Sequence, residues 1–247
     1  MSAEPADPAR AEVVVFIPAW NEEDNLPAVL AELREGLPHA DLLVIDDGST
    51  DATAQVARAH GADVLSFGEN RGLRIGIATG YREAAERGYA FCGRVDADGQ
   101  HPVAELARLL ELVRSGACDV AIGSRFAPGQ GYEDDRYRPS AARRLGIGLL
   151  QAGMRVRLGR SFHDPGSGMV AANARAMPVM GVPYTSGAPE VEALMRLDAA
   201  GLRVEEVAVE MRARASGESR LRGRKAVKLV ITVAGTLLFF RWMNRRG

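Results

Sequence analysis

Two carboxylates and a carboxamide follow an apolar run near the middle of the chain. The run over 89–95 leads directly into Asp96, Asp98 and Gln100, which stand two positions apart. If this run is a strand that ends in a turn, the three side chains reach one edge of a sheet, where ligands bind in open α/β folds. Oxygen donors suit Mg²⁺ or Mn²⁺, which also take water and substrate phosphates as ligands. A solvated acidic turn is the alternative interpretation.

Two earlier apolar runs also end in polar side chains. The first is followed by Asn21 and Glu22, and the second ends in Asp46 and Asp47. Asp46 and Asp47 could accept hydrogen bonds from a nucleobase edge or from ribose hydroxyls. The alternative is that Asp47, Ser49 and Thr50 only build a turn and cap a helix.

Glycines recur every four residues in the segment that follows Asn70. Gly72, Gly76 and Gly80 would line one face of a helix. Such a face permits close approach of the backbone, either to the sheet or to a diphosphate. The spacing is neither a dinucleotide-binding fingerprint nor a Walker loop.

Two segments in the second half of the chain combine glycines with charged groups. Asp164 stands on a glycine-rich turn, and Arg212, Arg214 and Arg220 surround a Ser-Gly-Glu-Ser sequence. Guanidinium groups around a glycine are suited to binding phosphates.

Alternating apolar and helix-like segments must position these groups. We expect strands over 12–18, 42–46, 63–67, 89–95 and 119–124, separated by helices over 25–36, 51–61, 73–87 and 102–115. This alternation predicts an α/β fold with a mainly parallel sheet covered by helices. The pattern then becomes irregular, with a polar loop over 126–138 that is long enough to be a lid, basic amphipathic residues over 140–158, a helix over 189–200 and a half-exposed strand over 202–211.

The composition excludes several classes of protein. The chain has 247 residues, 47% of them apolar, and a formal net charge of −1, which argues against a nucleic-acid-binding protein. Its two cysteines form no metal-type spacing and no disulfide framework. Because the first twelve residues lack the profile of a signal peptide, we expect a cytoplasmic protein with a disordered tail over 1–11.

Five segments in series resemble the signature of family 2 glycosyltransferases. They are Pro18-Ala-Trp-Asn-Glu, Asp46-Asp-Gly-Ser-Thr-Asp, Asp96-Ala-Asp-Gly-Gln-His-Pro, Asp164-Pro-Gly-Ser-Gly and Arg214-Ala-Ser-Gly-Glu-Ser-Arg. The third and fifth most resemble the branch that uses dolichyl or polyprenyl phosphate. The resemblance implies a GT-A domain over 12–222, a nucleotide-sugar donor, a divalent cation and inversion at the anomeric carbon.

The resemblance also implies roles for individual residues. The donor nucleotide would contact Pro18, Ala19, Asn21, Glu22, Asp46, Asp47, Asn70, Gly72 and Asp96. The cation would be held by Asp96, Asp98 and Gln100. The phosphates or the acceptor would meet Arg125, Arg214, Ser219 and Arg220. The catalytic residues would be Asp98, Asp164 and Arg214. Arg74 departs from the family, which often has a small residue there.

The need for a general base depends on the acceptor. A phosphate oxygen is already ionised near neutral pH and needs no strong base, whereas a hydroxyl does. Asp164 is then the candidate base. Glu190 and Glu192 are the next candidates, although ordinary helix residues are the simpler interpretation of both.

The C-terminal segment over 223–247 is basic and apolar. Between Lys228 and Arg241 lie uncharged residues that would form a helix of about 18 Å, which is too short for a hydrocarbon core of about 30 Å. We expect this helix to lie at the inner membrane surface, with its basic flanks on anionic lipids. The alternatives are a core helix, or a contact in a homo-oligomer or with a membrane-protein partner.

The main hypothesis is therefore an inverting, metal-dependent transferase that moves a hexose from GDP-mannose or a UDP-hexose to a polyprenyl or dolichyl phosphate. One alternative keeps the donor but uses a soluble glycan or natural product as acceptor. The other is a non-catalytic protein that binds sugar nucleotides.

Overall fold

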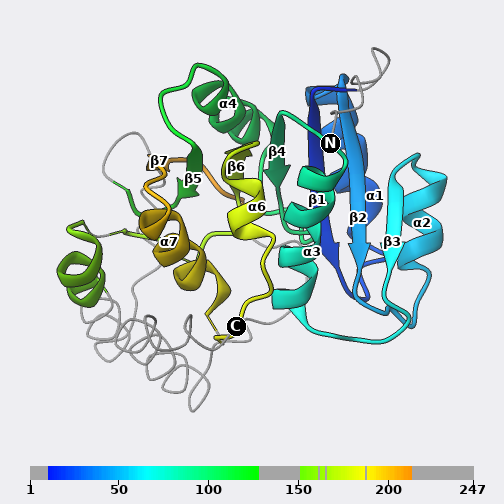
Figure 1. The fold of residues 1–247 in the computed structure, drawn as a ribbon. Coiled ribbons are helices and arrows are strands. Elements are labelled where there is room, and N and C mark those ends of the chain that lie inside the picture. Colours follow the sequence, from blue (N-terminus) through cyan, green and yellow to red (C-terminus); the bar gives the residue numbers. More distant parts are fainter. Residues whose placement is uncertain (1–10, 128–150, 161, 165, 187, 213–247) are drawn as a thin grey trace, which may run out of the picture.

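A seven-stranded sheet forms the centre of the protein, and helices cover both of its faces (Figure 1). The computed structural model describes residues 11–127, 151–160, 162–164, 166–186 and 188–212. The strand order is β3-β2-β1-β4-β6-β5-β7. This arrangement confirms the expected α/β fold with a mostly parallel sheet and helices on both faces.

The first half of the chain alternates strands and helices as its sequence predicts. The strands are β1 (Val13–Ala19), β2 (Ala40–Asp46), β3 (Asp63–Ser66), β4 (Phe91–Arg94) and β5 (Val120–Ser124). The helices between them are α1 (Leu26–Gly36), α2 (Thr53–Ala59), α3 (Leu73–Glu86) and α4 (Val103–Arg114). Strands β1 to β4 are paired in parallel, so their carboxyl ends meet at one edge of the sheet.

The second half contains a strand that the sequence analysis missed. β6 (Val170–Asn173) lies between β4 and β5 and runs antiparallel to both. It is followed by α6 (Met177–Met180), α7 (Pro189–Ala199) and the edge strand β7 (Val204–Ala208), while residues 151–158 are also helical. Because β6 runs in the opposite direction, its amino end lies at the same edge as the carboxyl ends of β4 and β5.

Two apolar clusters hold the helices on opposite faces of the sheet. Alternate residues of a strand point to opposite faces, so Phe16 of β1 belongs to one cluster, together with Ile77 of α3 and Leu194 of α7. Ile17, its neighbour, packs with residues of α1 and α4, such as Leu30. Burying one side chain of this size stabilises the fold by about 1.5–3 kcal/mol.

One of the spaced glycines is required by helix packing. A Cβ atom on Gly80 would lie 2.2 Å from the ring of Phe16, so α3 rests directly on β1 at this point. The Phe16 ring also meets Tyr81 edge-on, with 4.8 Å between the ring centroids. The helix-packing explanation of the glycine pattern is therefore correct at Gly80.

Candidate active site

The predicted pair of carboxylates lies in a turn at the carboxyl edge of the sheet. β4 ends at Arg94, and Asp96 and Asp98 follow it, with Asp98 only 9% exposed. The Asp98 Oδ1 atom accepts a hydrogen bond from the Gln100 backbone N–H at 3.1 Å. The Asp96 backbone N–H donates to His101 Nδ1 at 3.0 Å. The turn is thus held in place by its own polar groups.

His101 is a part of this turn to which the sequence analysis gave no role. Because its Nδ1 atom accepts the Asp96 backbone N–H, that nitrogen carries no proton. Burial lowers the pKa of His101, while the neighbouring Asp96 and Asp98 carboxylates oppose that shift. The His101 ring, in its neutral form, therefore stabilises the turn through this hydrogen bond.

The glycine-rich turn before β6 packs against this first turn. A Cβ atom on Gly168 would lie 2.2 Å from Asp96 Oδ2, so a side chain at this position would displace the Asp96 carboxylate. Ser167 stabilises the same turn, because its hydroxyl accepts the Met169 N–H and its own N–H donates to the Asp164 carbonyl. The motif that begins at Asp164 is therefore a neighbour of the carboxylate pair in space.

The carboxylates suit a divalent cation that shares its coordination with a substrate. Among the described residues, no group of three or more His, Cys, Asp or Glu side chains could hold a metal ion. Mg²⁺ and Mn²⁺, however, bind to one or two carboxylates and complete their shells with water and phosphate oxygens. Asp96 and Asp98 fit that description. Gln100 uses its amide nitrogen to donate to the Arg212 carbonyl at 3.3 Å, so any role in holding a cation would fall to its Oε1 atom.

Asp46 and Asp47 are both buried and both engaged by the protein. The Asp46 carboxylate accepts the Ser49 backbone N–H at 3.0 Å and the Ser66 hydroxyl at 2.8 Å. The Asp47 carboxylate accepts backbone N–H groups of Arg71 at 2.7 Å and Gly72 at 2.9 Å. Asp47 thus holds the loop that enters α3, but it is not the N-cap of a helix, which is Ala52 in α2 and Gly72 in α3. Contact of either residue with a donor stays a prediction.

The loops that follow β1 and β2 bind each other. Asn21 has a positive φ of 54°, and its side-chain oxygen accepts the Thr50 N–H at 2.9 Å. In return the Asn21 N–H donates to the Ser49 hydroxyl at 3.0 Å. The Glu22 N–H donates to Thr53 in the same way. Pro18 and Ala19 pair in register with the end of β2 and lie beside these two loops. The loops are held together by hydrogen bonds within the protein, without a ligand.

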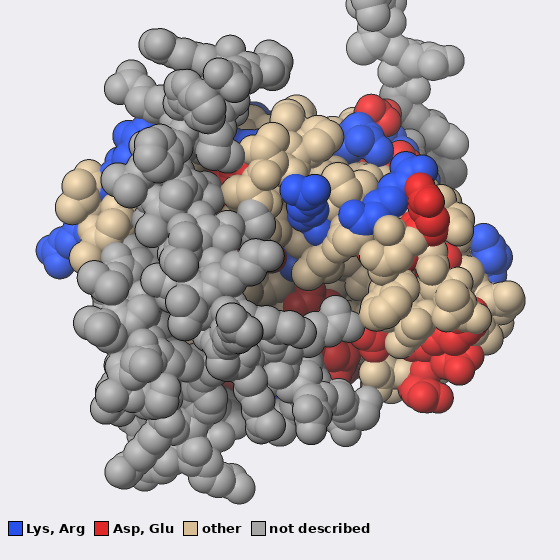
Figure 2. All heavy atoms as spheres, turned by 90° about the horizontal axis from the view of Figure 1, so that it is seen from below, with Lys and Arg blue, Asp and Glu red and all other residues tan. Residues whose placement is uncertain are grey.

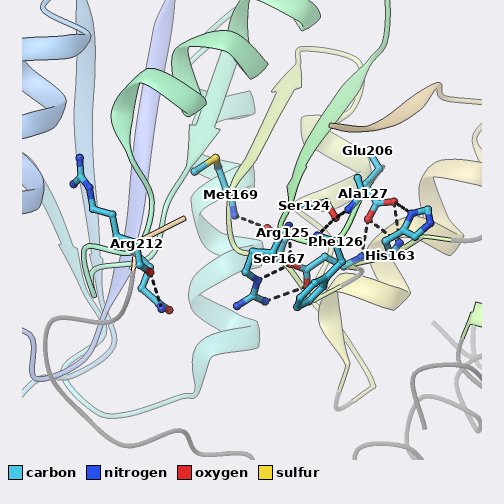
Figure 3. A network of polar contacts seen from close by, with 11 residues as sticks. Ser124, Arg125, Phe126, Ala127, His163, Ser167, Met169, Glu206 and Arg212 are labelled. Carbon is cyan, nitrogen blue, oxygen red and sulfur yellow. Dashed lines mark hydrogen bonds and ion pairs between the residues drawn. The ribbon is translucent and has the colours of Figure 1, made fainter. Parts of the chain in front are cut away.

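Arg125 is fixed in place directly after β5. Its Nε atom lies 2.8 Å from Asp164 Oδ2 and its Nη2 atom 3.1 Å from Asp164 Oδ1, which makes a two-pronged ion pair (Figure 3). The Arg125 side chain is 37% exposed and that of Asp164 only 7%. Both oxygens of the candidate base therefore contact a guanidinium group, which suits a residue that positions Arg125.

Glu206 of β7 supports this pair, although no motif includes it. Its carboxylate accepts the backbone N–H of Asp164 at 2.6 Å and that of His163 at 2.8 Å. It also lies 2.8 Å from His163 Nδ1 (Figure 3). Glu206 therefore fixes the backbone that carries Asp164. Glu205 and Glu206 are adjacent at the start of the predicted edge strand, and nothing in the sequence distinguishes Glu206 from its neighbour.

Two glutamates of α7 have different environments. Glu192 accepts the N–H groups of Thr185 and Ser186 and forms an ion pair with Arg196, so it is an ordinary structural residue, as expected. Glu190 instead faces Arg94, a buried arginine that the sequence analysis overlooked. Burial raises the pKa of Glu190, and Arg94 opposes this shift.

Charges of opposite sign lie close together on this edge of the molecule. Figure 2 views the carboxyl edge directly and shows acidic side chains in and beside a hollow near its centre, with basic side chains along one border. Exposed arginines at the start of α3, Arg71 and Arg74, belong to this edge. If a cation bound in the acidic hollow, an anion that it coordinates would lie near these arginines.

Several predicted residues lie outside the described part of the chain. Arg214, Ser219 and Arg220 are among them, as are the residues of the expected lid beyond 127 and the C-terminal segment over 223–247. The described chain reaches Arg212, whose N–H donates to the Gln100 carbonyl at 2.9 Å and whose guanidinium pairs with Glu32. Within the described ranges, no helix is long and apolar enough to cross a membrane.

A family model agrees with this geometry. Residues 14–172 match the model described as glycosyl transferase family 2. This range includes every strand from β1 to β5, the carboxylate turn and Asp164.

Relatives that carry mannosyltransferase or mannose-synthase names match this chain over about half to nearly all of its length. An undecaprenyl-phosphate mannosyltransferase of Micrococcus luteus is 32% identical over 244 residues, which cover 95% of this chain and 98% of that protein. A polyprenol monophosphomannose synthase of Mycolicibacterium smegmatis is 38% identical over 125 residues, or 47% of this chain and 46% of the other. A dolichol-phosphate mannosyltransferase of Pyrococcus furiosus is 29% identical over 86% of this chain and 60% of its own length.

Solved structures share the fold. The glucosyl-3-phosphoglycerate synthase of Mycobacterium tuberculosis, crystallised with Mn²⁺, UDP-glucose and phosphoglyceric acid, has a TM-score of 0.66 and 23% identity over 93% of this chain and 80% of that one. The mannosyl-3-phosphoglycerate synthase of Rubrobacter xylanophilus has a TM-score of 0.65 and 19% identity over 95% and 75%. At these identities the likeness concerns the fold alone.

Proposed function

The chain belongs to glycosyl transferase family 2, and on this premise we propose that it transfers a hexose from a nucleotide-sugar to a polyprenyl phosphate. The observation that carries the acceptor is the match to an undecaprenyl-phosphate mannosyltransferase along nearly the whole of both chains. The relative's name makes mannose the first sugar to test, so the donors to compare are GDP-mannose first and UDP-hexoses second.

The carboxyl edge of the sheet supports the donor half of this proposal. The loops after β1 and β2 are bound to each other before any ligand arrives, so they cost little further ordering when a base and ribose bind. Asp96 and Asp98 come from the neighbouring strand and face the same edge. A nucleotide placed along the loops would bring its diphosphate to this pair.

Asp96 and Asp98 would hold Mg²⁺ or Mn²⁺, with Gln100 through its Oε1 atom as a further ligand. The cation, when bound, would offset the negative charge that the departing nucleoside diphosphate gains as the sugar–oxygen bond breaks. The role of the protein is to fix the carboxylates, and the contacts of Gly168 and His101 do so. Arg214 is the other candidate for offsetting the negative charge of the departing nucleoside diphosphate.

Arg125 supports the acceptor half. Asp164 holds its guanidinium plane with two short contacts, and Glu206 holds the backbone of Asp164. A guanidinium fixed in this way binds a phosphate with little loss of side-chain entropy. The phosphate oxygen is already ionised near neutral pH, so it attacks the anomeric carbon without a strong base, and inversion follows from direct displacement. In this proposal Asp164 positions Arg125 and takes no proton.

The decisive experiment measures where the transferred sugar goes. Purified protein with MnCl₂ is given GDP-[¹⁴C]mannose or UDP-[¹⁴C]glucose and vesicles with or without undecaprenyl phosphate. We expect label in the organic phase only when the lipid phosphate is present. Label that stays in the aqueous phase as a new product would instead indicate a soluble acceptor.

A matched pair of variants separates turnover from binding alone. Asp98→Ala should lose turnover of the donor by at least about a hundredfold while its melting temperature stays near that of the wild type. Glu111→Ala, a change at an exposed position of the following helix α4, should keep full activity. Nucleotide-sugar binding with no turnover by the wild type would favour a non-catalytic protein and would refute the proposal.

A further inference from the structure

A buried arginine lies directly behind the carboxylate pair. Arg94 is the last residue of β4 and is 3% exposed. Its neighbours on this face belong to the apolar cluster between the sheet, α3 and α7, for example Tyr81 and Cys92. A guanidinium group in such surroundings is costly unless carboxylates compensate its charge. Its presence at this position therefore needs an explanation.

Arg94 is shared between two carboxylates from different parts of the chain. Its Nη2 atom lies 3.4 Å from Asp96 Oδ1 and 3.5 Å from Glu190 Oε1. Burial alone would lower the pKa of Arg94, but the two carboxylates raise the pKa above its usual value, so the group stays charged. One guanidinium group thus lies between two carboxyl groups.

The contact with Asp96 is long for an ion pair. Charge-assisted N–H···O bonds usually measure about 2.7–2.9 Å, and Arg125 reaches 2.8 Å from Asp164 in this same protein. A pair as close as that one would neutralise the Asp96 carboxylate. Because Glu190 contacts the same nitrogen, Arg94 is shared between the two carboxyl groups and does not pair closely with Asp96.

The remaining contacts of Arg94 do not resemble those of a residue kept for packing. Its Nε atom is buried and has no hydrogen-bond partner in the described part of the chain, and the same holds for the Tyr81 hydroxyl. Both residues line a small cavity together with Ser167, Tyr184 and Glu190. The cavity has room for about one water molecule, the usual partner of such groups. If Arg94 and Tyr81 served stability alone, protein atoms would accept the hydrogen bonds of these two groups.

We propose that Arg94 is a positioning residue that orients the Asp96 carboxylate toward the donor site, and that Glu190 prevents Arg94 from pairing closely with Asp96. This inference rests on the proposed function, because it requires a cation at Asp96. Gly168 also packs against this carboxylate, so both a glycine backbone and a guanidinium group limit where the Asp96 side chain can lie.

The test replaces the buried pair without leaving a lone charge. In the double variant Arg94→Met/Glu190→Met, apolar side chains of similar length fill the space, so the protein should keep a melting temperature near that of the wild type. Its affinity for Mn²⁺, measured by electron paramagnetic resonance with the metal alone and with saturating GDP or UDP, should fall about tenfold. Loss of a group that orients a metal ligand typically costs tenfold or more.

The matched control is a second buried ion pair. Glu192 and Arg196 lie one turn apart in α7 and pair with each other. The variant Glu192→Met/Arg196→Met should lose stability, because the N–H groups of Thr185 and Ser186 lose their acceptor. Its affinity for Mn²⁺ should equal that of the wild type.

The outcomes separate this inference from the proposed function. If the wild type does not bind Mn²⁺, the metal part of the proposed function fails. If the wild type binds Mn²⁺ and the Arg94→Met/Glu190→Met variant binds it equally well, Arg94 only compensates charge in the core and the inference is wrong. Should that variant fail to fold, Glu190→Gln decides. With the competing anion removed, Arg94 should close on Asp96 and weaken Mn²⁺ binding, and unchanged affinity would overturn the inference.

Discussion

Replacing Asp164 with asparagine tests how the acceptor phosphate is bound. The change keeps the shape of the side chain and removes its charge. In the structure Asp164 accepts one N–H group of Arg125 on each oxygen, at 2.8 and 3.1 Å. Asparagine has only one acceptor oxygen, and its amide N–H would face an arginine N–H. The two-pronged pair therefore cannot form, and Arg125 becomes free to move.

The size of the effect follows from the geometry. A hydrogen bond to a charged group contributes about 1.5–3 kcal/mol, but the Arg125 side chain is 37% exposed, so solvent screens the loss to about 1–2 kcal/mol. If that energy is lost from phosphate binding, the KM for the lipid phosphate should rise about 5- to 30-fold. The kcat and the KM for the donor should change little.

The kinetic pattern distinguishes positioning from general-base catalysis. If Asp164 takes a proton from the acceptor, Asp164→Asn should lower kcat by about 10²- to 10⁴-fold and leave the KM for the acceptor near its wild-type value. Initial rates over a series of undecaprenyl phosphate concentrations in vesicles, at saturating donor, give both constants.

Asp119 provides the control for lost stability. It is also a buried aspartate, and it accepts hydrogen bonds from the Arg175 side chain and the Arg203 backbone, but it precedes β5 whereas Arg125 follows that strand. Asp119→Asn should lower the melting temperature without raising the KM for the acceptor. If the two variants lose activity equally and in proportion to their lost stability, the reasoning about Arg125 is refuted.

Three further predictions concern stability and the membrane. Gly80→Ala should destabilise the fold by about 1–3 kcal/mol in urea unfolding, because the added methyl group meets the Phe16 ring; a neutral result would contradict the close packing of α3 on β1. The hydrogen bond from Arg212 lowers the pKa of Glu32. The wild type should therefore be about 0.5–1 kcal/mol more stable than Glu32→Gln at pH 7, and this difference should vanish as the pH falls below 4.5. A difference that persists in acid would exclude this ion pair as its source. Deletion of residues 225–247 should weaken sedimentation with anionic vesicles, and equal sedimentation of both proteins would exclude docking through this segment.

Much of the fold could be predicted from local patterns. Apolar runs with helical segments between them identify β1 to β5 and their helices, because the regular alternation marks even the short strands. β6 lies outside this alternation, since it follows a glycine-rich turn, so nothing in the local sequence marks it as a strand. Its place between β4 and β5 depends on pairing with both, which no local pattern records.

The site divides in a similar way. The carboxylates after β4 and the polar loops after β1 and β2 were predictable, because parallel strands bring their carboxyl ends to one edge. The supports of these groups were not. Glu190 lies 96 residues from Arg94, and Glu206 lies 42 residues from Asp164. The sequence alone does not distinguish these two glutamates from others, because each acquires its partner only in the folded structure.

The sequence by itself determined which groups reach the carboxyl edge, because strand direction and turn position are local properties of the chain. Only the tertiary structure decided how those groups are held. The reversed direction of β6 brings Gly168 against Asp96, and β5 and β7 bring Arg125, Asp164 and Glu206 together. Such contacts arise from strand pairing across the sheet, and their energies depend on burial and distance that exist only in the folded chain.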